Sequence, residues 1–448
     1  MDLTQGDIKS QLIKIAFPAG IGMMFHTFYN ITDTFYAGLI GSEAIGAMAI
    51  TFPVFFILLA LAIGFSQGTT ALISNYIGAK DIKNACEVYI QALIYSLLIS
   101  ITIGLLIFYS SEWIFNFFGA EGDFLLMAIS YISVIALGAP FMILNLVVNS
   151  ALNSIGDTKK NRNIMVFGFF LNIGLNPLLC FGLFFIPALG IAGIALSTVI
   201  VQIIATIYLF YYVLKTEMLK NFNISMLKIK MHFLKSFVSQ SLPMCTSYLM
   251  IAFGFFVLTK FVTLYGSSAA AAFGIACRIE ELILLPTIGL NTALLSIVGQ
   301  SYGAQKIQRV RESYMMALKI GMLMMFFGFL VLITFGGYLS SLFTKDIEVI
   351  NISKDYLFIF AFSTFFFVII HMSGSIFQGI KKPFYTTLYA FIRLGILPIT
   401  LLYTINTYFN FGINGIWIGM LLINIVVAII IFYHLRKILF SIEKKSKI

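Results

Sequence analysis

Hydrophobic residues fall in long runs along this sequence, and short polar connections separate the runs. A helix needs about 20 predominantly apolar residues to cross the hydrocarbon core of a bilayer. Stretches of about that length or longer lie at residues 11–40, 44–78, 88–109, 124–155, 160–184, 190–214, 235–265, 269–300, 314–341, 351–379, 384–408 and 412–440. The pattern therefore predicts an all-α polytopic membrane protein with twelve transmembrane helices.

The predicted helices form two similar sets of six. The stretch "AFPAGIGMMFHTFYNITDTFYAGLIGS" resembles "SLPMCTSYLMIAFGFFVLTKFVTLYGS", and this match aligns Pro18 with Pro243. Further landmarks recur with nearly the same offset, namely Gly41 with Gly266, Gly78 with Gly303, Gly156 with Gly379 and Gly190 with Gly412. A nearly constant offset over most of the chain indicates an internal duplication.

The duplication predicts the domain organisation. Six crossings return the chain to the side on which it began, so the two halves have parallel topology and a pseudo-two-fold axis along the membrane normal. We predict an N-terminal six-helix lobe at 1–214, a cytoplasmic linker at 215–234 and a C-terminal six-helix lobe at 235–448. Two lobes of this kind are suited to alternating access, which is typical of transporters.

Basic residues predict the orientation. Lys and Arg cluster in every second connection, for example "GAKDIKNA", "GDTKKNR", "GAQKIQRVRE" and "GIKKP", whereas the intervening loops contain a single lysine, Lys345. An excess of Lys and Arg marks the cytoplasmic side, so both termini are expected in the cytoplasm of a cell-membrane protein. This distribution also explains the net charge of +10 without a nucleic-acid partner, which would need a folded basic face.

Composition supports the membrane assignment. The chain is 60% hydrophobic and 10% charged, whereas soluble domains have about 25% charged residues. The four cysteines are scattered without a CxxC pair, and we interpret them as packing residues rather than metal ligands.

One acid interrupts the first predicted helix. Between Leu12 and Ile40, Asp33 is the only acidic residue. An aspartate at the centre of a membrane helix costs roughly 2.5–3.5 kcal/mol, and such residues are functional by default. Tyr29 and Asn30 precede it by four and three residues and share its helix face, and His26 lies about two turns away. Because burial disfavours the charged form of a carboxyl group, Asp33 is a candidate proton carrier.

Paired asparagines add polarity to the first half. Asn172 and Asn176 are four residues apart, as are Asn149 and Asn153, so each pair shares one helix face. Such side chains can form a binding site or simply link helices, a contact worth roughly 0.6 kcal/mol. The spacing alone leaves both interpretations open.

Several motifs carry a family resemblance. They are "YNITDTFYAG", "TTALISNYIGAKD", "NSALNSIGDTKK", "NIGLNP", "GIAGIALST", "GIACRIEELILLPTIGLNTALLSIVGQSYGAQK" and "GSIFQGIKKP". In this order and spacing the sequence resembles the multidrug and toxic compound extrusion (MATE) family, nearest its DinF-like branch. The resemblance implies a two-lobe antiporter, not an enzyme, that expels organic cations or amphipathic drugs. Its coupling ion would be H⁺ or Na⁺, and no cofactor is expected.

The resemblance also implies a cation-coupling site. By similarity this site consists of Asp33, Tyr29, Asn172, Asn176 and Thr198. Cavity candidates near it are Asn30, His26, Tyr131, Asn149, Asn153 and Met23. Many family members carry an acid where this chain has Asn176, and one fewer anionic ligand weakens a site for a hard cation. This difference favours protons over sodium.

The second half retains fewer charges. At the repeat position of Asp33 it has Leu258, and the stretches that carry acids in the related NorM branch contain none. A possible charged site in the C-terminal lobe consists of Arg278, Glu280, Glu281 and Arg393. The alternative is a local ion pair between Arg278 and Glu280 that fixes helices, because buried charges are usually paired.

Two other functions compete with a cation-coupled exporter. A lipid-linked sugar flippase of the same broader superfamily would share the two-lobe plan, but a cationic cleft or extra helices would be expected. A membrane enzyme or channel would need a catalytic or pore motif, and no HExxH, Walker A or selectivity-filter repeat is present. We therefore predict a monomer in the lipid bilayer that exchanges small molecules for protons and does not bind nucleic acid.

Overall fold

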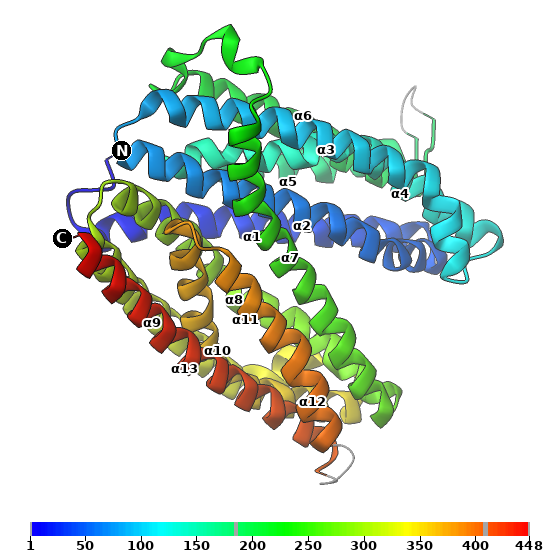
Figure 1. Ribbon diagram of the computed structural model, residues 1–448. Coiled ribbons are helices and arrows are strands. Elements are labelled where there is room, and N and C mark those ends of the chain that lie inside the picture. Colours follow the sequence, from blue (N-terminus) through cyan, green and yellow to red (C-terminus); the bar gives the residue numbers. More distant parts are fainter. Residues whose placement is uncertain (1, 183–186, 406–410, 447–448) are drawn as a thin grey trace. The chain divides into compact units, whose positions relative to one another are not determined.

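The computed structural model describes residues 2–182, 187–405 and 411–446, and the regular structure in these ranges is helical (Figure 1). The first repeat contains α1 (Ile8–Ile40), α2 (Ser42–Gly78), α3 (Ile82–Phe117), α4 (Gly122–Ser154), α5 (Lys159–Cys180) and α6 (Ile191–Leu214). The second contains α7 (Met231–Val262), α8 (Ser267–Gly303), α9 (Ile307–Ser341), α10 (Ile347–Gly379), α11 (Phe384–Phe391), α12 (Leu397–Thr404) and α13 (Gly412–Ser446). Two short 3₁₀ turns, Leu219–Asn221 and Ile224–Leu227, lie between the repeats.

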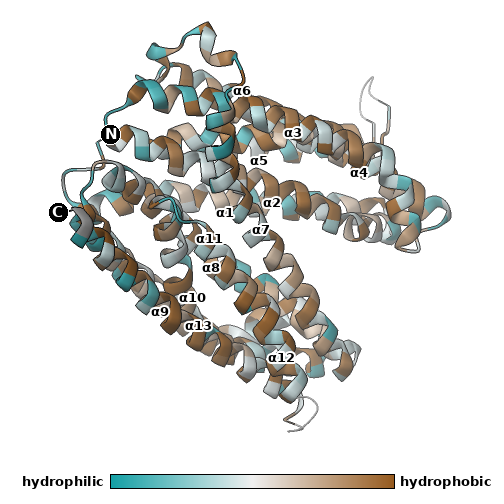
Figure 2. Cartoon of the chain, in the orientation of Figure 1, coloured by the Kyte–Doolittle hydropathy of each residue, from teal (hydrophilic) through white to brown (hydrophobic). Residues whose placement is uncertain are grey.

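The twelve predicted transmembrane helices are confirmed. Twelve helical spans in the described ranges are long and apolar enough to cross a membrane, and apolar residues run along their lengths (Figure 2). The eleventh span is Phe384–Thr404, in which α11 and α12 are joined by a π-helical turn, Ile392–Ile396. The predicted end of this span, 406–408, lies outside the described residues.

The backbone reproduces the duplication at the helix ends. Lys80 after α2 and Gln305 after α8 both have positive φ, 60° and 59°, and the two residues are 225 positions apart. Gly156 after α4 and Lys381 after α10 form a second such pair, with φ of 76° and 60°. In each case a left-handed residue closes the helix end with the same hydrogen-bond pattern. The structural counterpart of Gly156 is therefore Lys381, and the sequence-based alignment with Gly379 was two residues out of register.

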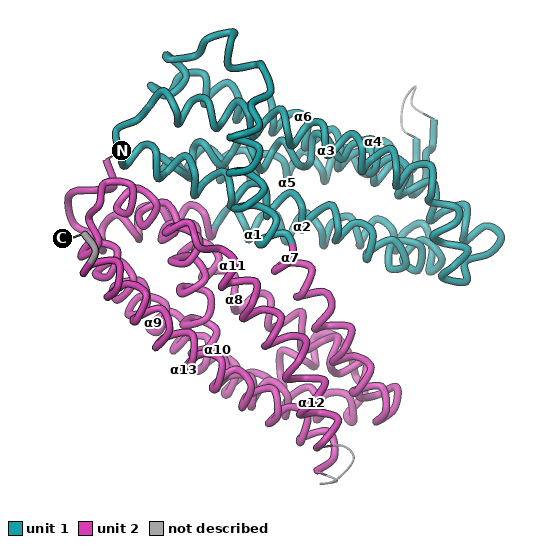
Figure 3. Tube along the Cα trace, in the orientation of Figure 1, with its two compact units in different colours: residues 1, 21–245 teal, residues 2–20, 246–448 magenta. Residues whose placement is uncertain are grey.

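Packing divides the chain into two compact units (Figure 3). Unit 1 comprises Ile21–Cys245, and unit 2 comprises Asp2–Gly20 and Thr246–Ile448. Helix α1 therefore begins in unit 2 and continues in unit 1, and α7 begins in unit 1 and continues in unit 2. The predicted lobes, 1–214 and 235–448, follow the repeat and keep each of these helices whole. Residues 20 and 245, where the assignment changes, are again 225 positions apart.

Glycines allow close packing of the two helix segments that begin in the opposite unit, the start of α1 in unit 2 and the start of α7 in unit 1. In unit 1, a Cβ atom on Gly64 of α2 would lie 2.6 Å from the backbone nitrogen of Cys245 in α7, and one on Gly68 would lie 2.9 Å from the backbone of Ser241 in α7. In unit 2, a Cβ atom on Gly289 of α8 would lie 2.5 Å from the carbonyl oxygen of Ala16 in α1. Gly289 occupies the repeat position of Gly64. Backbones can approach this closely in a membrane only where side chains are absent or small.

Polar side chains also hold the chain just before α1 and α7. In unit 2, Arg309 of α9 donates hydrogen bonds of 2.8–3.0 Å to three carbonyl oxygens between Leu3 and Gly6 and to the side chain of Gln11. In unit 1, Gln91 of α3 donates to two carbonyl oxygens of residues 226–228 and accepts from the backbone N–H of Lys230. Both helices are thus fixed at their first turn as well as at the glycine crossing.

The glycine crossing predicts opposite effects for two substitutions in α8. Gly289→Ala places a methyl group against the backbone of α1 and is expected to destabilise the protein by roughly 1–3 kcal/mol. Gly274→Ala adds the same methyl group where nothing lies within 4 Å, so it is expected to stabilise the helix by up to about 1 kcal/mol. Thermal unfolding of the purified variants in detergent measures both changes. Equal or greater stability of Gly289→Ala would contradict the close crossing.

Candidate functional site

The predicted acid lies at the centre of a buried polar network in unit 1. Asp33 of α1 is 4% exposed. Its Oδ1 atom accepts hydrogen bonds from the side-chain amides of Asn172 (2.9 Å) and Asn176 (2.8 Å) of α5. Its Oδ2 atom accepts a bond of 2.9 Å from the hydroxyl of Thr198 in α6. The structure thus brings together four of the five residues predicted for the coupling site.

Helix geometry explains how α5 supplies two of the donors. Asn172 and Asn176 are one turn apart, so both project from the same face, and both are fully buried. The amide of Asn176 also donates to the Oδ1 atom of Asn172 at 3.1 Å. Each asparagine therefore fixes the orientation of the other as well as that of the carboxylate.

Ser197 completes the network, and sequence analysis missed it. Its hydroxyl donates to Oδ1 of Asn176 at 2.5 Å and accepts from the amide of Asn172 at 3.0 Å. This contact fixes which amide end faces Asp33, because the carbonyl end of Asn176 is occupied by a donor. The signal in the sequence was the adjacent Ser–Thr pair in the otherwise apolar stretch "GIAGIALSTVIV".

Other predicted residues line the surroundings of the network. Tyr29, one turn before Asp33, and Tyr131 of α4 are both buried, and both lie close enough to Asp33 to interact with its charge. The Tyr29 hydroxyl is buried without a hydrogen-bond partner. Asn149 and Asn153 of α4 are buried too, and the Oδ1 atom of Asn149 has no partner. These side chains form a polar surrounding but donate no described hydrogen bond to the carboxylate.

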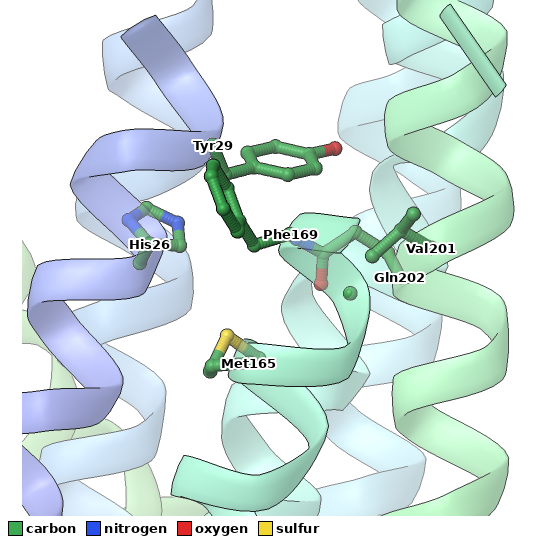
Figure 4. A pocket seen from close by; sticks show the side chains of 7 residues that line it. His26, Tyr29, Met165, Phe169, Val201 and Gln202 are labelled. Atoms are coloured by element: carbon green, nitrogen blue, oxygen red, sulfur yellow. The ribbon is translucent and has the colours of Figure 1, made fainter. Parts of the chain in front are cut away.

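A small hollow opens beside Tyr29 (Figure 4). Figure 4 shows the side chains around it, His26 and Tyr29 from α1, Met165 and Phe169 from α5, and Val201 and Gln202 from α6. These side chains come from α1, α5 and α6, the three helices that also form the Asp33 network. His26 and Tyr29 stack with 6.3 Å between ring centroids. The hollow is therefore contiguous, through Tyr29, with the surroundings of the carboxylate.

Of the six predicted cavity residues, only His26 lines this hollow. The Asn30 side chain is exposed and donates to the backbone carbonyl of His26 at 3.0 Å, so it satisfies its own helix rather than facing Asp33. Met23 is partly buried and does not line the hollow. The α-helical spacing placed Asn30 on the face of Asp33, but a position three residues away is offset enough to reach the exposed side.

Of the four charged residues predicted for the C-terminal lobe, two are exposed and two are at least partly buried. Arg278 and Glu281 are exposed, and Arg278 forms no ion pair with Glu280 among the described residues. Instead the Oε2 atom of Glu280 accepts a hydrogen bond of 2.6 Å from the hydroxyl of Tyr356 in α10. Arg393 is buried in the π-helical turn. The interpretation of Arg278 and Glu280 as a local ion pair was therefore wrong.

The electrostatics of the Asp33 network are simple. Its donors are neutral amides and a hydroxyl, and the ion pairs of the described chain, Lys220–Glu217 and Lys230–Glu87, do not involve Asp33. No cluster of three His, Cys, Asp or Glu side chains occurs in the described ranges. A carboxylate with neutral partners can be neutralised by a proton or by a cationic ligand.

Comparisons with known proteins identify the family. The sequence model of the MatE family matches residues 18–178 and 243–404, which lie in both repeats. The chain is 26% identical over 440 residues to a FAD transporter of Shewanella oneidensis, covering 97% of this chain and 96% of that protein. It is 25% identical over 433 residues to the multidrug export protein MepA of Staphylococcus aureus, covering 95% and 93%.

A solved structure shares the fold. It is described as the outward-facing conformation of a multidrug resistance MATE family transporter of the MOP superfamily, and it matches with a TM-score of 0.92 and 27% identity. The match covers 99% of this chain and 98% of the other. The resemblance to the DinF-like branch stays a prediction. Because the family model matches well over half of the chain and includes parts of both repeats, the protein belongs to the MatE family.

Proposed function

We propose that the protein is a secondary active transporter that exports organic cations or amphipathic drugs in exchange for protons. Its family membership and the names of its relatives support multidrug efflux. The absence of a Walker A sequence argues against an ATP-driven pump. The single observation that carries the coupling mechanism is the buried Asp33 carboxylate with neutral donors only.

Asp33 couples the two fluxes by competition. When it is ionised, the site carries a negative charge that attracts a cationic drug. When it is protonated, that attraction is lost and the drug is released. Each ligand favours a different state of the same lobe, which is the thermodynamic requirement for a ligand to shift a conformational equilibrium.

The orientation of the amides favours a proton over sodium. Asn172 and Asn176 present N–H groups to the carboxylate, and Ser197 donates to the carbonyl oxygen of Asn176. A sodium ion would instead need the carbonyl oxygens of Asn172 and Asn176 to face it, because hard cations bind oxygen ligands. Sodium binding in this network would therefore require both amides to turn and their present hydrogen bonds to break.

Export also requires a defined orientation. Basic residues in alternate connections support an orientation with both termini in the cytoplasm of a cell-membrane protein. The connections α2–α3, α4–α5, α8–α9 and α10–α11 then lie on the cytoplasmic side. Protons entering from outside would refill Asp33, and the drug would leave in the opposite direction.

Replacing the coupling acid tests the proposal. Asp33→Asn keeps the size of the side chain and removes its charge, so proton-driven efflux of a cationic dye from proteoliposomes should fall by roughly tenfold or more, within the usual range of coupling between sites. Asp123→Asn, the same substitution at an exposed position of α4, is the matched control and should keep wild-type efflux. Wild-type efflux by Asp33→Asn, in correctly folded protein, would refute the role of Asp33.

A second measurement concerns the coupling ion. Dye efflux should follow an imposed inward proton gradient and change little with a sodium gradient. Asn176→Asp adds a second carboxylate to the network and should increase the response to sodium, since affinity for hard cations rises with ligand charge. Efflux by the unaltered protein that requires sodium and ignores the proton gradient would contradict proton coupling.

The orientation can be tested by cysteine labelling. In a variant without the four native cysteines, Lys159→Cys and Lys381→Cys should react with an impermeant maleimide only from the cytoplasmic side. Lys345→Cys, in the connection before α10, should react only from outside. All three positions are exposed, so accessibility of the side chain does not limit labelling. The reverse pattern would overturn the orientation and with it the direction of transport.

A further inference from the structure

Unit 2 contains a buried guanidinium group, that of Arg393, which forms no ion pair within 4 Å among the described residues. Arg393 is 7% exposed, and its Nη1 atom is buried without a hydrogen-bond partner. Its Cζ atom lies 4.9 Å from the centre of the Phe367 ring in α10. Neither ion pair found among the described residues involves Arg393. A buried charge is costly unless it is paired, and the cation–π contact leaves the Nη1 atom without a hydrogen-bond acceptor.

The backbone around Arg393 is fixed and unusual. The residue belongs to the π-helical turn Ile392–Ile396, and such turns frequently occur at functional sites. Helix α7 packs directly against this turn, because a Cβ atom on Gly254 would lie 2.9 Å from the Cβ atom of Leu394. The arginine is therefore presented by a closely packed element rather than by a loop, as a precise binding site requires.

The acid whose charge faces Arg393 has another hydrogen-bond partner. Glu280 of α8 is only half-buried, and its Oε2 atom accepts a hydrogen bond of 2.6 Å from the Tyr356 hydroxyl. It forms no ion pair with Arg393. The ring of His371 stacks against that of Phe367, with 5.9 Å between centroids and 16° between ring planes. Glu280 therefore moderates the positive charge without supplying the hydrogen bonds that the guanidinium lacks.

Aromatic rings extend from the arginine through the unit. Phe367 contacts Phe360 (5.6 Å between centroids), Phe360 stacks on Tyr356 (5.8 Å), and Tyr356 meets Trp417 of α13 edge to face (4.8 Å). The Nε1 atom of Trp417 is also buried without a hydrogen-bond partner. Buried polar groups in native structures usually have a hydrogen-bond partner. Of the several buried side-chain atoms without one among the described residues, these two are donors that border one group of aromatic rings.

We propose that this aromatic cluster, defined by Arg393, Phe360, Phe367, Tyr356 and Trp417, binds an aromatic compound that carries a carboxylate or phosphate group. The anionic group would accept hydrogen bonds from the guanidinium, which matches the geometry of such oxygens. The aromatic part would stack on the neighbouring rings. In physiological terms the assignment rests on the proposed function, because it adds anionic aromatic compounds to the transported substrates.

Riboflavin and riboflavin 5′-phosphate provide a matched pair of probes. Both are fluorescent and share one ring system, and they differ only in the phosphate group. Their binding to the purified wild-type protein in phosphatidylcholine nanodiscs can be measured by equilibrium dialysis. We expect the phosphate form to bind roughly tenfold more tightly or better, the ratio that corresponds to one charge-assisted hydrogen bond. Equal binding of the two probes by the wild-type protein would overturn the proposal without any substitution.

Variants assign the preference to the cluster. Arg393→Gln should abolish the difference between the probes, and Arg393→Lys should retain part of it because the charge is kept. Arg311→Gln removes an exposed arginine of α9 and should bind as the wild type does. Monodispersity and melting temperature establish that each variant is folded. An unchanged preference in folded Arg393→Gln would overturn the assignment.

Two further experiments distinguish a bound aromatic compound from a bound lipid headgroup, and this inference from the proposed coupling at Asp33. If phosphatidylglycerol in the nanodiscs abolishes binding of the phosphate probe, a lipid headgroup occupies the cluster and the assignment to aromatic compounds is wrong. Asp33→Asn should leave the probe preference unchanged, because that network lies in unit 1. Loss of dye efflux in Asp33→Asn with no probe preference in the wild type would refute only this inference. Wild-type dye efflux by Asp33→Asn, together with a clear probe preference in the wild-type protein, would refute only the proposed coupling.

Discussion

A carboxylate in a membrane interior must receive hydrogen bonds from its neighbours, and this constraint organises the first half of the protein. Asp33 obtains three hydrogen bonds, from Asn172, Asn176 and Thr198, so α1, α5 and α6 must meet at one level. Ser197 then orients the amides. The arrangement stabilises the charge without cancelling it, because all the donors are neutral. The ionised carboxylate is therefore stabilised in the packed helices, and it can still bind a proton or a cation.

Helix α1, which carries Asp33, contributes residues to both compact units. Asp33 lies in the part of α1 that belongs to unit 1, whereas Asp2–Gly20 belongs to unit 2. Pro18 lies within α1 two residues before the change of unit, and Pro243 has the same place in α7. A proline removes one helical hydrogen bond and favours bending there. Protonation or drug binding at Asp33 thus acts on a helix that contributes residues to both units and that can bend at Pro18.

The sequence allowed the helices and the duplication to be predicted, but it did not allow the contacts between helices to be predicted. Apolar runs and repeated landmarks were sufficient for twelve helices and a duplication, because both are local or periodic features. They did not predict that α1 and α7 begin in the opposite unit, since the partner of a helix in space is not encoded in its own periodicity. The glycines 64, 68 and 289 marked the close crossings, but only their contacts identify the helices they face.

The polar sites show the same limit. The resemblance to the family led to Asp33 and three of its partners, and the structure places these four side chains in one network. Ser197 was missed because serine is common in helix contacts, and Asn30 was included because helical spacing does not resolve which side is exposed. In the second half, the significance of Arg393 depends on an unpartnered nitrogen and a π-helical turn, and neither is visible in the sequence.

Proton release on drug binding tests the central claim most directly. If a cationic drug and a proton compete for Asp33, adding a cationic dye to the purified protein in weakly buffered detergent solution should release protons. The release should approach one proton per bound dye at pH values where Asp33 is protonated beforehand, and it should disappear in Asp33→Asn. Dye binding without proton release in the wild type, or equal release by Asp33→Asn, would contradict the account.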